Sequence, residues 1–322
     1  MGVGAPAGPA GVGPAVVGPA VVGPAVVGPA VVVPTIGRLA LLERCLDGLS
    51  RQTTPPGEVL VVHDGAADPV LARWAGRLPL RSLVVAATGA AARRNAGWQA
   101  SSAPLVAFTD DDCEPSPGWL AALVAATAQA DLAHGPVAPH PADSEVRSAF
   151  GRTVVVDRPT GLFPGANLAV RRSALERVAG FDPSLHAGED TDLAHRVLAG
   201  GTAVWAPEAL VLHAVRPVTF PQHLRSLPRW RSLPEVVRRH PALRAELPGR
   251  LFWKTSHPLA LLALGGLVLM PWRARAGLLA LPLLARSWRA RGPWFGTQVA
   301  VADAAEVLVV VAGSARARSV LL

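Results

Sequence analysis

Apolar positions follow two different periods along the middle of the chain. Short β-branched or apolar runs predict strands at residues 30–33, 59–62, 105–109 and 209–212. Apolar positions spaced three to four residues apart predict helices at residues 39–50, 119–129, 171–179 and 191–199. This alternation predicts an α/β sandwich with a mainly parallel sheet, in which ligands bind beyond the carboxyl ends of the strands.

The pattern changes beyond residue 251. Three apolar runs follow, at 258–270, 276–285 and 299–312, and the third carries Asp303 and Glu306. None of them reaches the roughly 20 residues that a membrane-spanning helix needs. We therefore expect a helical hairpin that turns at residues 273–275 and dips into one leaflet, with a full crossing still open if flanking residues snorkel.

The first 32 residues form a pentapeptide array. Gly-Pro-Ala-Val-Val begins at Gly13, Gly18, Gly23 and Gly28. Because this density of proline and glycine prevents helix and interrupts sheet, residues 1–29 are expected to form a flexible tail. The last copy runs directly into Val33-Pro34-Thr35, so we expect only that copy to pair in the sheet, and deletion of residues 2–27 to leave activity intact.

Charge divides the chain of 322 residues into two parts. Half of the residues are hydrophobic and 17% are charged, a composition that excludes a wholly disordered chain. Residues 1–215 carry a net charge of −4, whereas residues 216–322 carry +12. No nucleic-acid-binding signature accompanies the arginines, which flank apolar runs, so an anionic membrane surface is the expected partner rather than nucleic acid. A solvated arginine-rich surface is the alternative. We predict a domain at 30–235 and a membrane-associated region at 236–322.

The two cysteines, Cys45 and Cys113, form neither a disulfide framework nor a zinc motif. This usage is typical of a reducing compartment. No secretory signal is evident, because the first residues lack a basic segment.

Three carboxylates end an apolar strand in Phe108-Thr109-Asp110-Asp111-Asp112. Acids packed this closely repel one another unless a cation or hydrogen-bond donors balance them. Oxygen ligands suit Mg²⁺ or Mn²⁺, and Asp110 and Asp112 are spaced to reach one ion together. A solvated acidic turn is the alternative, and the apolar strand before the acids favours the metal.

A second acidic run, Gly188-Glu189-Asp190-Thr191-Asp192, precedes a predicted helix. Acids at a helix start are also favoured by the helix dipole, so spacing alone leaves capping and catalysis both open.

Several motifs together resemble family 2 glycosyltransferases of the GT-A fold, of the bacterial type with a membrane-associated helical region. The resemblance covers roughly residues 30–215, and its motifs occur in the family's order. The motifs are Val32-Val33-Pro34-Thr35, Val61-Val62-His63-Asp64-Gly65, Ala92-Arg93-Arg94-Asn95-Ala96-Gly97, Phe108–Asp112 with Pro117-Gly118-Trp119-Leu120, Gly165-Ala166-Asn167-Leu168, Gly180-Phe181-Asp182 and Glu189-Asp190-Thr191-Asp192-Leu193.

On the donor side, the resemblance implies a nucleotide-sugar site. Asp64 matches the acid that hydrogen-bonds the base, and Arg94 belongs to the segment beside the nucleotide. The other implied donor contacts are Pro34, Thr35, Asp110 and Asp111.

For metal and chemistry, the resemblance implies a divalent ion, Mg²⁺ or Mn²⁺, on Asp110 and Asp112. His213 matches a place that contacts metal or phosphate in some GT-A enzymes, although a single histidine at a strand end is more often structural. Asp190 matches the general base and Glu189 its neighbour. Asn167 and Trp119 are the implied acceptor-side residues.

The implied reaction is transfer with inversion. The metal stabilises the departing nucleoside diphosphate, and a carboxylate takes the proton of the acceptor hydroxyl. The basic apolar region indicates a lipid-linked or cell-envelope glycan as acceptor, at the cytoplasmic face of the cell membrane.

The chain departs from the family at two positions near the nucleotide. Ile36-Gly37 replaces the usual aromatic residue and asparagine, and His63 replaces an aspartate before Asp64. Base preference is therefore open.

Two other classes of protein compete with a transferase. A nucleotide-sugar pyrophosphorylase requires a glycine-rich loop with a lysine near the N-terminus, whereas the only lysine is Lys254. A non-catalytic carbohydrate-binding or scaffold protein predicts loss of the site carboxylates, which are all present.

Overall fold

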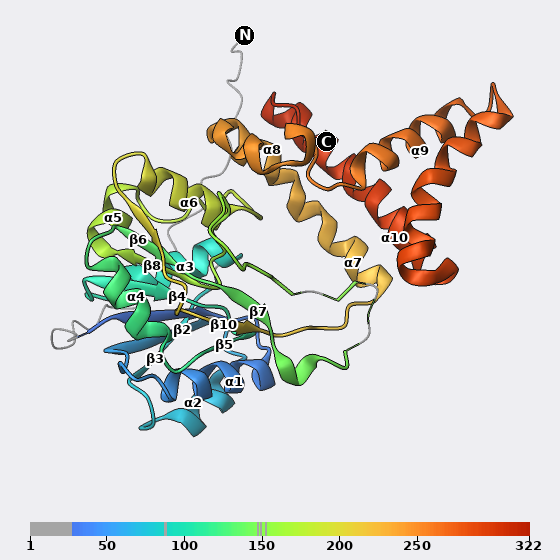
Figure 1. Cartoon of the computed structure of the whole chain (residues 1–322). Helices are drawn as coiled ribbons and strands as arrows, with labels where there is room; N and C mark the ends of the chain where they lie inside the picture. Colours follow the sequence, from blue (N-terminus) through green and yellow to red (C-terminus); the bar gives the residue numbers. More distant parts are fainter. Residues whose placement is uncertain (1–27, 87–88, 147, 149, 152) are drawn as a thin grey trace, which may run out of the picture.

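A seven-stranded sheet forms the centre of the molecule (Figure 1). The computed structural model describes residues 28–86, 89–146, 148, 150–151 and 153–322. The strands lie in the order β3-β2-β1-β4-β8-β6-β9. Their bounds are β1 Ala30–Pro34, β2 Glu58–His63, β3 Leu80–Val84, β4 Leu105–Phe108, β6 Leu132–His134, β8 Leu168–Arg171 and β9 Ala203–Trp205. Strands β3, β2, β1 and β4 are mutually parallel, and β8 runs antiparallel to β4 and β6.

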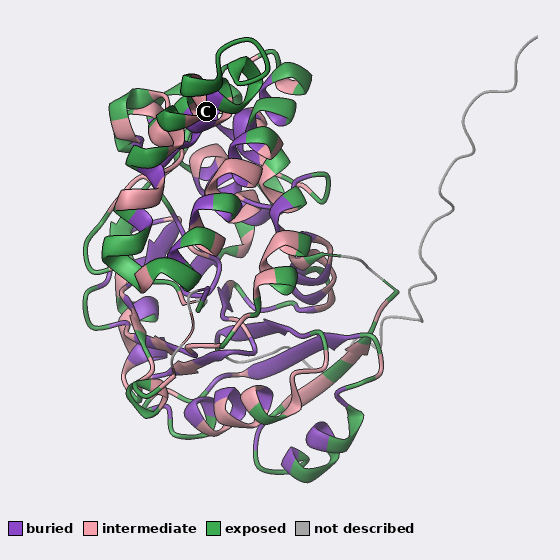
Figure 2. Ribbon diagram, turned by 90° about the vertical axis from the view of Figure 1, so that its right-hand side faces the viewer, coloured by how far each residue is buried: buried purple, intermediate pink, exposed green. Residues whose placement is uncertain are grey.

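Both faces of the sheet are covered by helices, and this explains why its central strands β1 and β4 are apolar without interruption. Alternate residues point to opposite faces, so Val31 and Val33 join one core and Val32 joins the other. The first core contains α1 (Leu39–Ser50), α2 (Asp68–Trp74) and α4 (Trp119–Thr127). The second contains α3 (Ala90–Ala100), α5 (Arg172–Arg177) and α6 (Glu189–Leu198). Figure 2 shows the buried strands between these layers.

A second, three-stranded sheet carries the residues that follow the acidic run. Its order is β5-β10-β7, with bounds β5 Cys113–Pro115, β7 Val137–Pro139 and β10 Val211–His213. The antiparallel register of β10 on β5 places His213 opposite Cys113. This small sheet therefore brings His213 beside the acidic run, about a hundred residues earlier in the chain.

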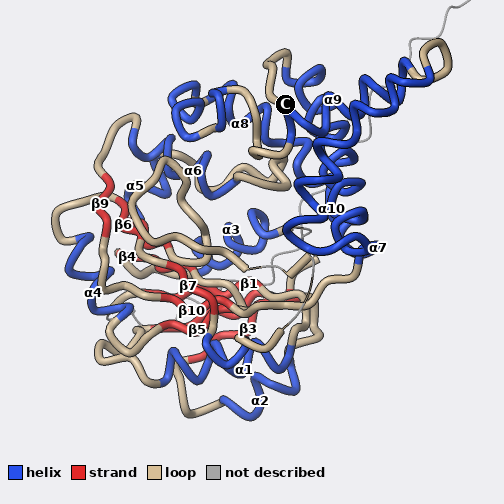
Figure 3. Tube along the Cα trace, turned by 45° about the vertical axis from the view of Figure 1, so that its right-hand side comes forward, coloured by secondary structure: helices blue, strands red, loops and turns tan. Residues whose placement is uncertain are grey.

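Helices α7 to α10 form a separate helical part above the carboxyl end of the sheet (Figures 1 and 3). Their bounds are α7 Phe220–Ser226, α8 Leu233–Arg239, α9 His257–Leu269 and α10 Leu281–Ala317. Short 3₁₀ turns connect them: η2 Leu227–Ser232, η3 Pro241–Glu246, η4 Pro248–Arg250 and η5 Ala274–Ala280. A further one, η1 Pro141–Asp143, follows β7. Helix α10 packs directly on η2, since a Cβ at Gly313 would overlap the Arg231 carbonyl oxygen.

The hairpin expected at residues 273–275 is confirmed in its geometry. Helix α9 ends at Leu269 and η5 begins at Ala274. The two segments pack backbone to backbone, because a Cβ at Gly266 would overlap the carbonyl oxygen of Ala276. A second reversal lies at Gly292, where φ is 74°. Beyond it a Cβ at Gly296 would lie 2.6 Å from the Ser287 carbonyl oxygen.

None of the three apolar runs alone has the expected spanning length, but the helical stretch Ala274–Ala317 is long and apolar enough to cross a membrane by length and composition. It is not one continuous helix, because the chain reverses at Gly292. It also contains the fully buried Glu306 carboxylate, which lies 2.7 Å from Lys254 Nζ. However, 39% of its most apolar window is buried inside the protein itself.

The other predicted elements occur close to their expected positions, with ends displaced by at most two residues. The last repeat copy, from Gly28, enters β1 and pairs with β2 and β4, as expected. The flexible tail predicted for residues 1–29 stays a prediction, because residues 1–27 and the earlier copies lie outside the described residues. The boundary between residues 235 and 236 falls inside α8 and stays a prediction.

Candidate active site

A cavity of about 670 Å³ opens beyond the carboxyl ends of β1 and β4, between the sheet and the helical part. Four elements meet at its polar end: the segment after β1, the acidic run after β4, the start of α3 and the start of α6. They contribute Pro34 and Thr35, Asp110, Arg93 and Arg94, and Glu189 and Asp190 respectively. This is where ligands are expected in an open parallel sheet.

Asp111 is fully buried at the turn after β4, where an arginine from another segment neutralises it. The Thr35 hydroxyl donates to Asp111 Oδ2 over 2.5 Å, and Arg38 Nε donates to the same oxygen over 3.1 Å. The Arg38 guanidinium also pairs with Asp111 Oδ1 and with Asp112, and so bridges two carboxylates. Burial raises the pKa of Asp111, outweighing Arg38 and the Thr35 hydrogen bond, which lower it.

The turn at Gly37 directs Arg38 toward these acids. Gly37 has a φ of 82°, and its amide donates to the Thr35 hydroxyl over 3.2 Å. A Cβ at this position would lie 2.9 Å from Ala66 Cβ. Positive φ and close approach together require glycine here.

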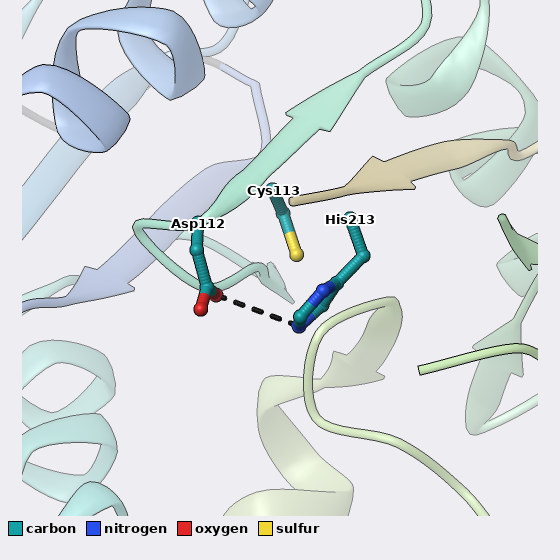
Figure 4. Close-up of side chains that lie close together, drawn as sticks. All are labelled: Asp112, Cys113 and His213. Atoms are coloured by element: carbon teal, nitrogen blue, oxygen red, sulfur yellow. Dashed lines mark ion pairs between the residues drawn. The ribbon is translucent and has the colours of Figure 1, made fainter. Parts of the chain in front are cut away.

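Asp112, Cys113 and His213 bring their side chains together behind this turn (Figure 4). One potential ligand atom from each lies within 4.8 Å of the others, and His213 Nε2 is 3.6 Å from Asp112 Oδ1. Arg216 Nε approaches Asp112 Oδ2 to 3.2 Å. Burial raises the pKa of the Cys113 thiol well above its usual value, and sulfur is a softer ligand than Mg²⁺ or Mn²⁺ prefers.

The donor set therefore fits a hard divalent cation. Carboxylate oxygen and imidazole nitrogen suit Mg²⁺ or Mn²⁺, whereas a neutral thiol does not. Two guanidinium groups already gather around Asp112, which shows that this carboxylate is placed to receive positive charge.

Arg94 links the acidic run to the start of α6. Its guanidinium donates to Asp110 over 2.7 Å and to Glu189 over 2.9 Å, and its side chain is only 4% exposed. Burial disfavours the charged guanidinium, but Asp110 and Glu189 outweigh it and raise the pKa of Arg94. Burial in turn raises the pKa of Asp110, and the Arg94 ion pair outweighs it, so the net shift is downward. A Cβ at Gly165 would lie 2.7 Å from Arg94 Cζ, so this arrangement requires glycine at 165.

Asp190 has an environment that raises the pKa of its carboxyl group. Its carboxylate accepts hydrogen bonds from the amides of Gly165 and Thr191, each over 2.7 Å. Burial and the charge of Glu189 raise its pKa to about 6, outweighing Arg94 and the two amides. By contrast, Asp192 on the same helix pairs with Arg196 and His240 and is structural. The acids at this helix start therefore divide into two kinds.

Comparison with protein-family models identifies the family of this chain. Residues 30–178 match the model for glycosyl transferase family 2, and residues 105–288 match that for glycosyl transferase family group 2. The chain belongs to glycosyltransferase family 2.

Two curated relatives of this glycosyltransferase act on different acceptors. The pre-mycofactocin glycosyltransferase of Mycobacterium tuberculosis is 34% identical over 140 residues, which cover 39% of this chain and 30% of the relative. The validoxylamine A glucosyltransferase of Streptomyces hygroscopicus subsp. limoneus is 28% identical over 269 residues, covering 69% of this chain and 58% of the relative. These relatives support sugar transfer in general.

Solved structures agree on the fold. The mannosyltransferase PcManGT from Pyrobaculum calidifontis, solved with GDP-Man and Mn²⁺, aligns with a TM-score of 0.56 at 21% identity, covering 90% of this chain and 86% of that one. S. aureus TarS 1-349 with UDP-GlcNAc aligns at 0.51 and 15% identity, covering 91% and 93%. The GT-A fold expected from the sequence is confirmed.

The predicted site residues of this glycosyltransferase fall into three groups. Six line the cavity, and three others, Asp111, Asp112 and His213, lie directly behind its acidic wall. The six are Pro34, Thr35, Arg94, Asp110, Glu189 and Asp190. Asp64 lies outside this lining, exposed at the end of β2, where it accepts a hydrogen bond from the Ala66 amide over 3.3 Å.

Trp119 and Asn167 are not brought to the cavity. Both are fully buried, and the Trp119 indole donates to Asn167 Oδ1 over 2.8 Å. The Asn167 amide donates in turn to the carbonyl oxygens of Pro136 and Ala209. They hold β7, β8 and β10 together, and their acceptor-side role stays a prediction.

Two arginines in the site were missed from the sequence. Arg38 follows Ile36-Gly37, the departure from the family pattern, and that departure was the available signal. Arg93 lines the cavity beside Arg94, and its buried Nε has no hydrogen-bond partner among the described residues. Nothing in the sequence separates Arg93 from a surface arginine.

Proposed function

We propose that this glycosyltransferase moves a sugar from a nucleoside-diphosphate sugar to a hydroxyl group with inversion, and that Asp190 is the general base. The observation that carries this proposal is the position of Asp190, which lines the same cavity as Asp110 and Arg94 and has a pKa of about 6. A base with a pKa near the working pH is both available and strong enough to take a proton.

In the proposed step, the acceptor oxygen attacks the anomeric carbon while its proton passes to Asp190. The bond between that carbon and the diphosphate oxygen breaks, and the nucleoside diphosphate leaves with the electron pair. Because one displacement occurs, the anomeric configuration inverts. The amides of Gly165 and Thr191 fix the orientation of the Asp190 carboxylate.

Positive charge for the donor diphosphate comes from several residues. Arg93 offers a buried guanidinium without a described partner at Nε, and we assign it to a diphosphate oxygen. Asp110, Asp112 and His213 would hold Mg²⁺ or Mn²⁺, and a bound divalent ion stabilises the charge of a departing diphosphate. The similarity in fold to PcManGT, whose structure was solved with Mn²⁺, supports this assignment. Arg94 bridges the Glu189 and Asp110 carboxylates.

The acceptor proposed is a lipid-linked or cell-envelope glycan at the cytoplasmic face of the cell membrane. The helical part exposes large apolar side chains, among them Trp272, Trp294 and Leu308, which are 77%, 74% and 56% exposed. Arginines alternate with them, as anionic lipid headgroups favour. Two buried free cysteines are consistent with the reducing side of the membrane.

The test is a donor screen with matched variants. Purified enzyme is assayed with UDP-, GDP- and dTDP-sugars, with and without Mn²⁺, and the product anomer is assigned by NMR. Asp190→Asn should lose at least about a thousandfold in kcat while donor affinity changes less than about threefold. Asp47→Asn, at an exposed ion pair on α1, is the control and should retain full activity. Retained configuration, or an active Asp190→Asn enzyme, would refute the mechanism.

A further inference from the structure

The cavity has two chemically different ends. Its polar end carries the ionised residues described above. Its other end, which we call the apolar arm, is formed by side chains of the helical part and of the loop before β8, including Leu162, Trp230, Leu233, Val236, Leu247 and Trp253. Apart from His186 and Arg229, the described side chains lining the arm are apolar.

The arm begins directly beside the proposed base. A Cβ at Gly188, which precedes α6, would lie 3.2 Å from Val236 Cγ2, so α6 and α8 touch at this point. Asp190 is two residues farther along α6. A molecule whose hydroxyl group reaches Asp190 therefore extends its next atoms along Val236 and Leu233.

The lining selects against a second sugar in this position. A hydroxyl group placed against these side chains loses its hydrogen bonds to water and gains none, at a cost of about 1–3 kcal/mol each. A hydrocarbon placed there gains from burial instead. The arm thus favours an acceptor with a long apolar body.

The arm also connects to the exposed apolar surface of the molecule. Trp230 and Trp253 pack in one cluster with Val310 of α10, so this helix supports the arm from behind these two side chains. On the same helix, Leu308 and Val311 are 56% and 38% exposed. The helix that supports the arm therefore also carries part of the apolar surface that we assign to the membrane.

We propose that the apolar arm binds the hydrocarbon chain of a membrane-borne lipid acceptor, whose hydroxyl-bearing head lies at Asp190. This inference rests on the proposed function and specifies its acceptor: the enzyme recognises the apolar chain as well as the hydroxyl group. A soluble acceptor with an apolar body could fill the arm in the same way. The experiment below distinguishes a soluble acceptor from a membrane-borne one.

Binding is measured first without any reaction. Alkyl β-glucosides with chains of four to twelve carbons, used below their micelle concentrations, are titrated against tryptophan fluorescence. Affinity should rise about tenfold for every two methylene groups until the arm is filled. Val236→Phe, which fills the arm, should weaken the long-chain ligands at least about tenfold and leave the four-carbon ligand unchanged.

A second variant changes a residue that lies outside the buried core. Leu162→Asp, at a position 39% exposed, places a carboxylate in the arm and should have the same effect on long chains. Val204→Asp, equally exposed on β9 and outside the cavity lining, is the matched control. Melting temperature and donor affinity show that each variant is folded.

The outcomes distinguish the two proposals. Chain-length-dependent binding without transfer from any donor would overturn the proposed function and keep the arm. Transfer with an affinity independent of chain length, or an unaffected Val236→Phe enzyme, would overturn the arm. Embedding the dodecyl acceptor in anionic vesicles should raise its rate of transfer above that of the free ligand. A lower rate in vesicles would refute the proposal that the acceptor is membrane-borne.

Discussion

Replacing Arg38 by alanine tests how the acidic run is held together. In the wild-type enzyme the Arg38 guanidinium bridges Asp111 and Asp112, whose side chains are 0% and 4% exposed. Alanine leaves both carboxylates buried, with the Thr35 hydroxyl on Asp111 and Arg216 beside Asp112. Removing one partner of a buried ion pair costs about 3–5 kcal/mol.

The expected loss is smaller than that upper range. Arg38 is itself 24% exposed, so water already screens part of its interaction. We expect Arg38→Ala to lose roughly 2–3 kcal/mol of unfolding free energy. For a chain of this size, that corresponds to a fall in Tm of about 3–5 °C. Arg73→Ala, which removes an exposed pair with Glu43, should change Tm by less than about 2 °C.

A divalent ion should reverse this loss. Arg38 and Mn²⁺ compete for the Asp112 carboxylate, so the alanine variant should bind Mn²⁺ about tenfold more tightly than wild type, a difference of about 1.4 kcal/mol. Scanning fluorimetry with and without Mn²⁺, together with Mn²⁺ titration by electron paramagnetic resonance, measures both effects. An unchanged Tm and an unchanged Mn²⁺ affinity would refute the interpretation of Arg38 as a counter-charge for these acids.

Three further predictions concern the cavity. The rate of transfer should fall about tenfold per pH unit below pH 6, because Asp190 becomes protonated there and cannot accept a proton. Burial and the charge of Glu189 raise the pKa of Asp190 to about 6, against the opposing effect of Arg94. A pH-rate profile of kcat measures this. Arg93→Ala should raise the donor KM at least about tenfold with little change in Tm, as followed by steady-state kinetics. Gly165→Ala should displace the buried guanidinium beside it and lower kcat/KM at least about tenfold, whereas Gly118→Ala, with open space around its Cβ, should leave the rate unchanged.

Sequence pattern predicted the parts of the fold that local chemistry determines. The continuous apolar strands, and the acids directly after β4, follow from residues close together in the chain. A strand was expected at the position of β10, but β5, β7 and β8 were not predicted, because strands of three or four residues carry too little pattern. The helical span Leu281–Ala317 was not predicted as one element, because Arg286, Arg289 and Arg291 separate its two apolar runs and the chain reverses at Gly292.

In the candidate site, too, the residues with a local signal were predicted and those that depend on distant contacts were not. Asp110, Glu189 and Asp190 were found because carboxylates at strand and helix ends are conspicuous. Arg38 was not, because its role depends on a guanidinium that reaches from the turn after β1 to the turn after β4, more than 70 residues away. Trp119 and Asn167 illustrate the opposite case, in which a role expected from a motif stays a prediction. A motif position was expected at the substrate, whereas the side chains bond to each other in the core.

The pairing of Lys254 with Glu306 has a practical consequence, because Lys254 is the single lysine of the chain. A protease that cuts only after lysine has one peptide bond to attack, and it lies between the catalytic sheet and the last two helices. Cleavage requires that bond to leave its folded setting, so its rate reports how often the helices detach. Slower digestion in the presence of vesicles or acceptor would show that the helices detach less often when either is bound. The cleavage rate of this one bond would then report that binding without any added label.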